Sequence, residues 1–152
     1  MELARVDVSD PVVAAELLDL QRRAYRVEAE LIGSDEIPPL RETLAELQAC
    51  GEIFLVARLE GELAGAVSWR SEDGTIDLHR LVVDPGHFRK GIGVALVRAA
   101  LASDPVARRA IVQTGASNEP AIALYRREGF EPDGEFEPVP GLRVARFAKR
   151  LR

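Results

Sequence analysis

The segment TIDLHRLVVDPGHFRKGIGVALVRAAL, residues 75–101, decides the fold, because it has the pattern of a strand, a turn and a helix in succession. β-Branched and apolar residues predominate up to Val83, which favours a strand. Asp84-Pro85-Gly86 supplies turn-forming residues, and an apolar helical run follows Gly91-Ile92-Gly93. The sequence therefore predicts a strand–turn–helix unit here.

The start of the predicted helix is a candidate anion site. Gly91 and Gly93 have no side chain that would keep a ligand away from the backbone. The free N–H groups of a first helical turn and the positive end of the helix dipole attract negative charge. Arg89 and Lys90 add positive charge at the same end. The alternative is a tight strand-to-helix turn that carries two surface cations.

Two nucleotide-binding motifs match this segment poorly. A Walker loop requires Gly-Lys-Ser/Thr, whereas Lys90 precedes Gly91 and Val94 follows Gly93. A dinucleotide-binding fingerprint requires a third small residue three positions after Gly93, and Leu96 occupies that position. The expected anion is therefore held by a loop of another kind.

Length and composition limit the class of protein. With 152 residues, 47% of them hydrophobic, the chain is expected to form one domain over residues 1–152. A net charge of −5 disfavours nucleic acid and anionic membrane as partners. The single cysteine, Cys50, suits a reducing compartment, and with His79 and His87 it shows no metal-ligand spacing. No signal peptide and no apolar run of about 18 residues is recognised, so a cytoplasmic protein without metal is expected.

The rest of the chain alternates between strand and helix patterns. Helices are expected at residues 11–27, 38–51, 91–103 and 118–129. Strands are expected at residues 3–8, 53–59, 63–69, 75–83, 109–114, 130–136 and 142–151. Seven strands mixed with four helices predict one layered α/β domain.

A second motif, SNEPAIALYRREGF, occupies residues 117–130. Asn118 is a candidate helix cap, and Ala121, Leu124 and Tyr125 fall on one face of the helix that follows it. Tyr125 is either a reactive phenol or a core aromatic residue whose hydroxyl is satisfied.

The two motifs in this order resemble motifs A and B of the GNAT superfamily of acetyl-CoA-dependent N-acetyltransferases. The motif A pattern, Gln/Arg-x-x-Gly-x-Gly/Ala, falls on residues 88–93, with Phe88 in place of the usual polar residue. The motif B pattern of Asn, Ala, Leu-Tyr and Gly-Phe is met throughout residues 118–130. The resemblance covers about residues 53–147. It implies a GNAT-like α/β (α+β) fold, a mixed twisted sheet of about seven strands with about four helices on its two faces.

The resemblance also implies acetyl-CoA as the acyl donor, with its pyrophosphate on the amides of the loop. The strand backbone at residues 81–83 is expected to hold the acetyl carbonyl and the pantetheine, and Asn118 is expected to contact the pantetheine arm. The implied coenzyme-binding residues are Leu81, Val82, Val83, Phe88, Arg89, Lys90, Gly91, Ile92, Gly93, Val94, Asn118, Ala121, Leu124 and Tyr125.

Acetyl transfer to an amine requires proton transfers, and three residues are candidates. Deprotonating a lysine-like amine at pH 7 costs about 4.6 kcal/mol, so a base or a desolvated acidic pocket is needed. Asp77 and His79, two apart on the predicted strand, are expected on one face with Leu81 and Val83. His79 is a candidate base. Some GNAT members have a His-x-His pair here that acts through water, whereas this chain has Asp77-x-His79, which leaves the base open between His79, Asp77 and water alone. The alternative is a pair that only orders the strand surface. Tyr125 is the expected general acid for the coenzyme thiolate.

The acceptor side carries weaker signals. Glu28, Glu30, Asp35 and Glu36 lie in the first helix–loop region, which by resemblance borders the acceptor cleft. Carboxylates there suit a cationic acceptor such as a polyamine, an aminoglycoside or a lysine side chain, and the alternative is a solvated acidic loop. Trp69 is expected either to line this pocket or to cap a hairpin.

The expected function is direct transfer of the acetyl group of acetyl-CoA to a primary amine of a small molecule or peptide. The alternatives are a longer-chain acyl donor, an unusual acceptor nucleophile, and a catalytically quiet acyl-CoA sensor or interaction module on the same scaffold. A homodimer through the closing strands or the hairpin is compatible with the sequence.

Overall fold

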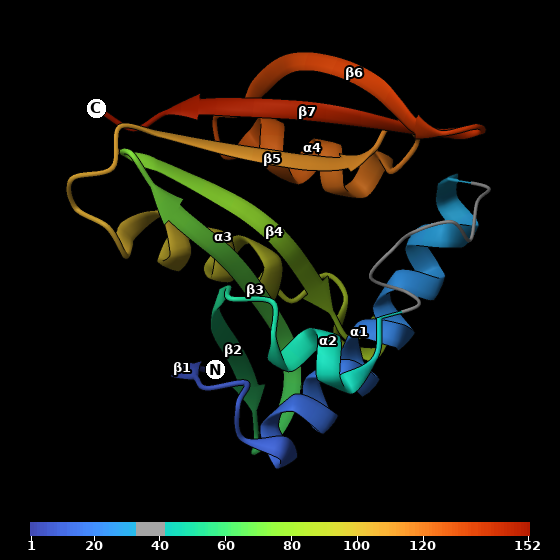
Figure 1. Cartoon of the computed structure of the whole chain (residues 1–152), viewed down its shortest axis with the longest axis vertical. Helices are drawn as coiled ribbons and strands as arrows, with labels where there is room; N and C mark the ends of the chain where they lie inside the picture. The colour runs from blue at the N-terminus through green and yellow to red at the C-terminus, as the bar shows by residue number, and fades with distance from the viewer. Residues whose placement is uncertain (33–41) are drawn as a thin grey trace.

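All seven strands in residues 1–32 and 42–152, the part of the chain that this computed structural model describes, join one mixed sheet (Figure 1). The strand order is β1-β2-β3-β4-β5-β7-β6, and only the β4–β5 pair is parallel. The strands are β1 (Glu2–Val6), β2 (Ile53–Leu59), β3 (Glu62–Glu72), β4 (Thr75–Val83), β5 (Arg109–Gly115), β6 (Glu131–Val139) and β7 (Leu142–Arg150).

Helices cover both faces of this sheet. The four α-helices of the described residues are α1 (Pro11–Ile32), α2 (Leu44–Gln48), α3 (Ile92–Ala102) and α4 (Glu119–Arg127), and a short 3₁₀ helix, η2, spans Pro85–His87. Residues of α1 and α2 pack in one core with Phe54 and Val82, whereas residues of α3 and α4 pack in a second core with Trp69 and Ile76. The predicted α/β fold with seven strands and four helices is confirmed.

The first two helices differ from the sequence-based expectation. Helix α1 continues to Ile32, although the sequence predicted fraying from about Val27. Helix α2 begins at Leu44, because Thr43 and Glu46 form a capping box in which each side chain accepts the other's backbone N–H, at 3.2 and 2.9 Å. Leu44, the first residue of this helix, is 36% exposed. The predicted helix start at residues 38–41 lies outside the described residues.

A β-bulge interrupts the pairing of β3 with β4. Ser68 pairs with Arg80 and Trp69 pairs with Leu78, so His79 is the extra residue on β4. A bulge reverses the alternation of side chains beyond it, because strand side chains alternate with a period of two.

The bulge changes which alternate residues of β4 face each core. Leu78 lies in the core below α3, whereas Val82, an even number of residues further on, lies in the core below α1. Leu81 packs against the α3 core. The prediction that Asp77 and His79 share a face with Leu81 is therefore wrong, and its physical cause is the extra residue at the bulge.

The parallel pair β4–β5 separates part of the way along the sheet. Pairing runs only from Thr75 opposite Arg109 to Leu78 opposite Val112. Beyond these residues the two strands diverge, and the sheet opens into a V between its larger and smaller parts (Figure 1). The candidate functional site lies at this opening.

Candidate functional site

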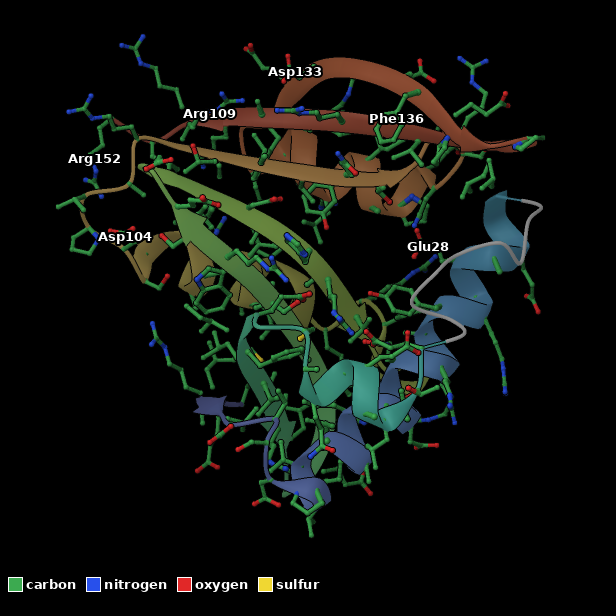
Figure 2. All side chains as sticks on the ribbon, viewed as in Figure 1. Glu28, Asp104, Arg109, Asp133, Phe136 and Arg152 are labelled. Carbon is green, nitrogen blue, oxygen red and sulfur yellow. The ribbon has the colours of Figure 1, made fainter. Side chains whose placement is uncertain are left out.

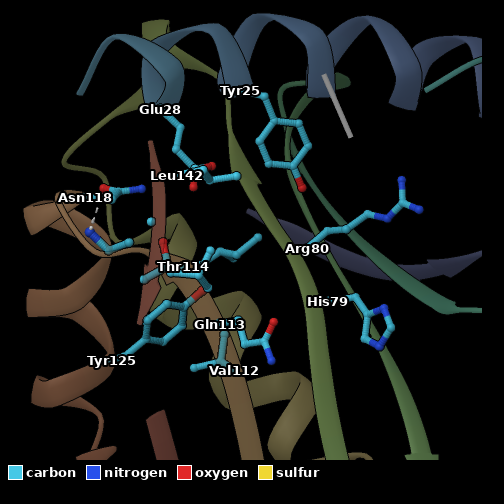
Figure 3. Close-up of a pocket in the computed structure, with 14 residues that line it drawn as sticks. Tyr25, Glu28, His79, Arg80, Val112, Gln113, Thr114, Asn118, Tyr125 and Leu142 are labelled. Atoms are coloured by element: carbon cyan, nitrogen blue, oxygen red, sulfur yellow. Dashed lines mark hydrogen bonds between the residues drawn. The ribbon is translucent and has the colours of Figure 1, made fainter. Parts of the chain in front are cut away.

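Two cavities meet beside the opening between β4 and β5. The larger, about 680 Å³, runs from the start of α3 along the end of β4 to α4. The smaller, about 240 Å³, lies between the ends of β4 and β5 (Figure 3). Their shared lining residues are Tyr25, Glu28, Leu81, Asn118 and Ala121. The larger cavity alone falls within the usual size range of small-molecule and cofactor sites, about 300–1,000 Å³.

The start of α3 has the properties of an anion site. Gly91 is the N-cap residue with φ 74°, a left-handed conformation that favours glycine, and no side chain caps the helix within the described chain. Gly91 and Gly93 line the larger cavity together with Arg89. A Cβ on Gly93 would lie 3.0 Å from Leu124 Cδ1, so glycine permits the close approach of α3 and α4. These features fit a bound pyrophosphate.

An ion pair connects the loop before α3 to α1. Asp84 Oδ1 accepts the N–H of Gly86 at 3.0 Å, and Asp84 Oδ2 lies 2.8 Å from Arg23 Nη1. The hydrogen bond from Arg23 is the main cause of the lowered pKa of the Asp84 carboxyl. Sequence reasoning missed Arg23, because 61 residues separate the partners and no local pattern connects them.

The predicted coenzyme-binding residues come together in this hollow. All of them except Lys90 line one of the two cavities. The Lys90 side chain instead places Nζ 3.1 Å from Nδ1 of His87. Arg89 is therefore the cation of the predicted loop that faces the larger cavity.

Tyr125 projects into the smaller cavity from α4. Its side chain is 4% exposed, and its ring makes an edge contact with Phe130 at a centroid separation of 5.6 Å. Burial raises the pKa of the Tyr125 phenol, and the nearby charge of Glu28 raises it further. The phenol therefore stays protonated at neutral pH, as a proton donor requires.

Glu28 reaches from α1 toward the end of α4 that carries Asn118 (Figures 2 and 3). Burial raises the pKa of the Glu28 carboxyl, while hydrogen bonds with the Asn118 side chain and the Gly115 backbone act in the opposite direction. The Asn118 Oδ1 atom accepts the N–H of Ala121 at 3.3 Å, which leaves its amide nitrogen to donate. The carboxyl group of Glu28 thus lies in both cavity walls within a partly desolvated environment.

The position of His79 differs from that expected of a base. Its Nδ1 lies 3.3 Å from Glu52 Oε2, and its Nε2 lies 3.2 Å from Asp77 Oδ2. The hydrogen bond to Glu52 is the main cause of the raised pKa of His79. The ring projects away from Tyr125 and Glu28 (Figure 3). Two neighbouring carboxylates stabilise the charged form of the imidazole, in which both ring nitrogens carry a proton. That form has no free lone pair to accept a further proton, which argues against His79 as the base.

A buried ion cluster adjoins His79 and was missed from the sequence. Arg80 Nε lies 2.9 Å from Glu52 Oε1, and Arg80 Nη2 lies 2.9 Å from Glu42 Oε2. Ser68 Oγ donates to Glu52 Oε1 at 2.6 Å. Burial alone would raise the pKa of Glu52, but hydrogen bonds from His79, Arg80 and Ser68 lower it to about 2. The cluster ties β4 to β3, to the residue preceding β2 and to the residue preceding the α2 cap.

The other substrate candidates within the described residues do not line the cavities. Glu30 is exposed and lines neither cavity. Trp69 is 1% exposed in the core below α3, with the Arg5 guanidinium 5.8 Å from its ring centroid, so it belongs to the core instead of the pocket lining. Asp35 and Glu36 lie outside the described residues. Of the candidates within the described residues, Glu28 lines the cavities and Glu30 and Trp69 do not.

Two other kinds of feature bear on the class of protein. In the described part of the chain, no group of three or more His, Cys, Asp or Glu residues is arranged to hold a metal ion. Among the helices described, none is long and apolar enough to cross a membrane.

Solved structures of acetyltransferases share this architecture. An acetyltransferase from Thermus thermophilus aligns with a TM-score of 0.79 at 21% identity, covering 99% of this chain and 98% of that one. The ribosomal-protein-S18-alanine N-acetyltransferase of Escherichia coli aligns with a TM-score of 0.78 at 17% identity, covering 98% and 92%. A PaiA N-acetyltransferase from Thermoplasma acidophilum, solved in complex with coenzyme A, aligns with a TM-score of 0.72 at 18% identity, covering 99% and 100%. The sheet that opens between β4 and β5 is therefore the GNAT fold.

Sequence comparison gives the family. The acetyltransferase (GNAT) family profile matches residues 14–130, so this chain belongs to the GNAT acetyltransferase family, whose members use acyl-CoA. The UPF0157 protein YqkA of Bacillus subtilis (strain 168) is 36% identical over 138 residues, which cover 91% of this chain and 40% of that protein.

Two further relatives match shorter stretches. The mycothiol acetyltransferase of Clavibacter michiganensis subsp. michiganensis is 39% identical over 83 residues, covering 51% of this chain and 26% of the relative. The streptothricin acetyltransferase of Streptomyces lavendulae is 37% identical over 81 residues, covering 51% and 43%. The chain spans less than half the length of these three relatives.

Proposed function

We propose that this chain transfers the acetyl group of acetyl-CoA to a primary amine of a small molecule or peptide, by direct attack of the amine on the thioester. The observation that carries the proposal is that the two cavities lie side by side and share five lining residues. One contains the start of α3, where an anion fits, and the other contains the protonated Tyr125 phenol. A thioester anchored by its pyrophosphate in the first reaches the second past Leu81 and Asn118.

The loop and the helix start supply the proposed coenzyme site. The N–H groups of the first turn of α3 have no capping side chain in the described chain, and they bind the pyrophosphate oxygens with help from the Arg89 guanidinium. The Arg23–Asp84 ion pair holds the preceding loop in place. This preorganisation reduces the ordering that binding would otherwise require.

The end of β4 positions the acyl group. Beyond Leu78 this strand has left β5, so backbone groups on its open side at residues 81–83 are available to the pantetheine and the acetyl carbonyl. Hydrogen bonds to the carbonyl oxygen stabilise the negative charge that develops when the amine attacks. Tyr125 then donates its proton to the departing sulfur.

Free-thiol release from acetyl-CoA tests this function. The purified protein is incubated with acetyl-CoA and, in turn, spermidine, kanamycin, an amide-capped lysine with a free side chain and an alanine-starting hexapeptide. We expect amine-dependent thiol release, with the acetylated amine identified by mass spectrometry. Calorimetry with coenzyme A measures binding separately. Binding without release with any amine would favour the acyl-CoA sensor, and absence of binding would contradict both.

A further inference from the structure

We propose that Glu28 is the group that accepts the proton of the attacking amine. This inference rests on the proposed function and deepens it, because it assigns the base to a residue of α1 instead of the β4 histidine expected from the sequence. The argument starts from placement. Glu28 lines both cavities, and it lies across the hollow from the Tyr125 hydroxyl that is proposed to protonate the thiol (Figure 3).

Among the described residues, no cation adjacent to Glu28 neutralises its carboxylate. Its hydrogen bonds are to the Asn118 side chain and to the backbone of Gly115, both of which are uncharged. Arg80, the arginine of β4 that lines the smaller cavity, is already paired with Glu42 and Glu52. The carboxylate is therefore available to an incoming ammonium group, whose positive charge it attracts.

Several elements contribute titratable groups to the walls of the two cavities. Those in the cavity walls, besides Glu28 itself, are Tyr25 on α1, His79 and Arg80 on β4, His87 and Arg89 before α3, and Tyr125 and Arg127 on α4. Both tyrosines have raised pKa values, caused mainly by burial, and are neutral donors. His79 is occupied by two carboxylates. Among these groups of the described residues, Glu28 is thus the carboxylate in the walls of the two cavities.

Partial desolvation suits Glu28 to this task. A carboxylate with the ordinary glutamate pKa is a weak base at neutral pH, and raising the pKa toward the working pH makes proton transfer more favourable. Burial has this effect on the Glu28 carboxyl. Helix α1 holds the residue in place, since it continues past Glu28 to Ile32.

The proton balance of the proposed step is complete. The Glu28 carboxylate removes one proton from the substrate ammonium and becomes a carboxylic acid. The neutral amine nitrogen bonds to the thioester carbonyl carbon, and the C–S bond breaks with its electron pair on sulfur. Tyr125 protonates the sulfur and regains a proton from the new amide nitrogen, and Glu28 releases its proton to solvent. One ammonium and one thioester give one amide, one thiol and one proton.

The pH dependence of Glu28→Gln tests the proposal. With the amine that gives the fastest thiol release, we expect kcat/KM to fall by about 10²–10⁴-fold near neutral pH. Wild type should show an ascending limb whose apparent pKa exceeds the ordinary glutamate value, followed by a plateau. The variant should instead rise tenfold per pH unit up to the pKa of the amine, because only free amine then reacts. Coenzyme A affinity should stay unchanged.

Two control variants distinguish a proton acceptor from a structural residue. Glu28→Asp keeps a carboxylate and should restore part of the rate and the wild-type limb. Glu16→Gln alters another carboxylate of α1, one that pairs with Arg58 outside both cavities, and should leave the profile unchanged. A Glu28→Gln enzyme that keeps both the rate and the limb of wild type would overturn the proposal.

A second measurement does not depend on turnover. The Glu28 carboxyl carbon is followed by ¹³C NMR titration in protein saturated with coenzyme A, and its signal is assigned by its loss in Glu28→Gln. We expect a pKa above the ordinary value of 4.5. Titration at or below that value would overturn the assignment. Absence of thiol release by wild type with every amine would contradict the proposed function instead.

Discussion

Replacing Tyr125 with phenylalanine removes the proposed proton donor and little else. The side chain is 4% exposed, and its packing includes an edge contact with Phe130 at 5.6 Å and an interplanar angle of 66°. Phenylalanine keeps that contact and most of the volume. The cost in folding free energy should therefore be limited to the hydroxyl, about 0.5–1.5 kcal/mol.

The expected effect on catalysis is much larger. A positioned general acid contributes about 10²–10⁴-fold to the rate, which corresponds to about 2.7–5.4 kcal/mol of transition-state stabilisation. The raised pKa of Tyr125 means that the hydroxyl is fully protonated in the neutral range, so the loss should apply across that range. The effect should fall on kcat, because the hydroxyl acts on the departing sulfur.

The assay is thiol release from acetyl-CoA under single-turnover conditions, with coenzyme A affinity measured by calorimetry and folding by urea denaturation. We expect Tyr125→Phe to bind coenzyme A within about twofold of wild type and to unfold with the same m-value. If its single-turnover rate stays within about threefold of wild type, the phenol is not the proton donor, and the mechanism built on it is wrong.

Three further predictions concern binding, pH and packing. Gly91→Val should weaken coenzyme A binding at least tenfold, measured by calorimetry, because valine strains the left-handed backbone at φ 74° beside the anion site. Acid should destabilise the fold as pH falls from about 5 toward 2, by up to about 3 kcal/mol, because Glu52 has a pKa of about 2 in the folded protein and an ordinary value of 4.5 otherwise. Gly65→Ala should cost about 1–3 kcal/mol in urea unfolding, since its Cβ would lie 2.8 Å from Ile92 Cγ2, whereas Gly86→Ala should cost less than about 0.5 kcal/mol.

Each of these expectations has a contrary outcome. Unchanged affinity in Gly91→Val would remove the helix start from the coenzyme site. For Glu52 the sign is fixed: a lowered folded-state pKa contributes stability above the unfolded value, which is lost on acidification. Constant stability between pH 5 and 2 would therefore contradict the buried ion cluster. Equal costs for Gly65→Ala and Gly86→Ala would contradict the close packing of α3.

Local signals explain why the strand–turn–helix unit was predictable. Turn residues, a left-handed glycine and an apolar helical run all lie within residues 75–101, so each element is specified by its own neighbours in sequence. The coenzyme-binding residues follow from the same unit, and all but Lys90 line the cavities. The motif on α4 has a similar local character, because its cap Asn118 and its Tyr125 lie within two turns of one helix.

Features set by contacts between distant segments were not predictable. The bulge at His79 depends on pairing with β3, and the partners of Arg80 come from residues 28 and 38 positions away. The contact between His79 and Glu52 could not be predicted from the sequence for the same reason. Glu28 was placed in a fraying, acidic segment, because no cap signal marks the extension of α1 and no local pattern reports the carboxyl's contact with Asn118.

The extra residue on β4 has a consequence for how this chain tolerates changes in length. Deleting His79 would remove the extra residue and restore continuous alternation, so Arg80, Leu81 and Val82 would keep the faces on which they now lie. Leu81 would still pack against the core below α3, and Val82 would still lie in the core below α1. His79 is therefore a position at which β4 can lose one residue and keep the walls of both cores, whereas a one-residue deletion elsewhere in the strand, with the bulge kept, would exchange them.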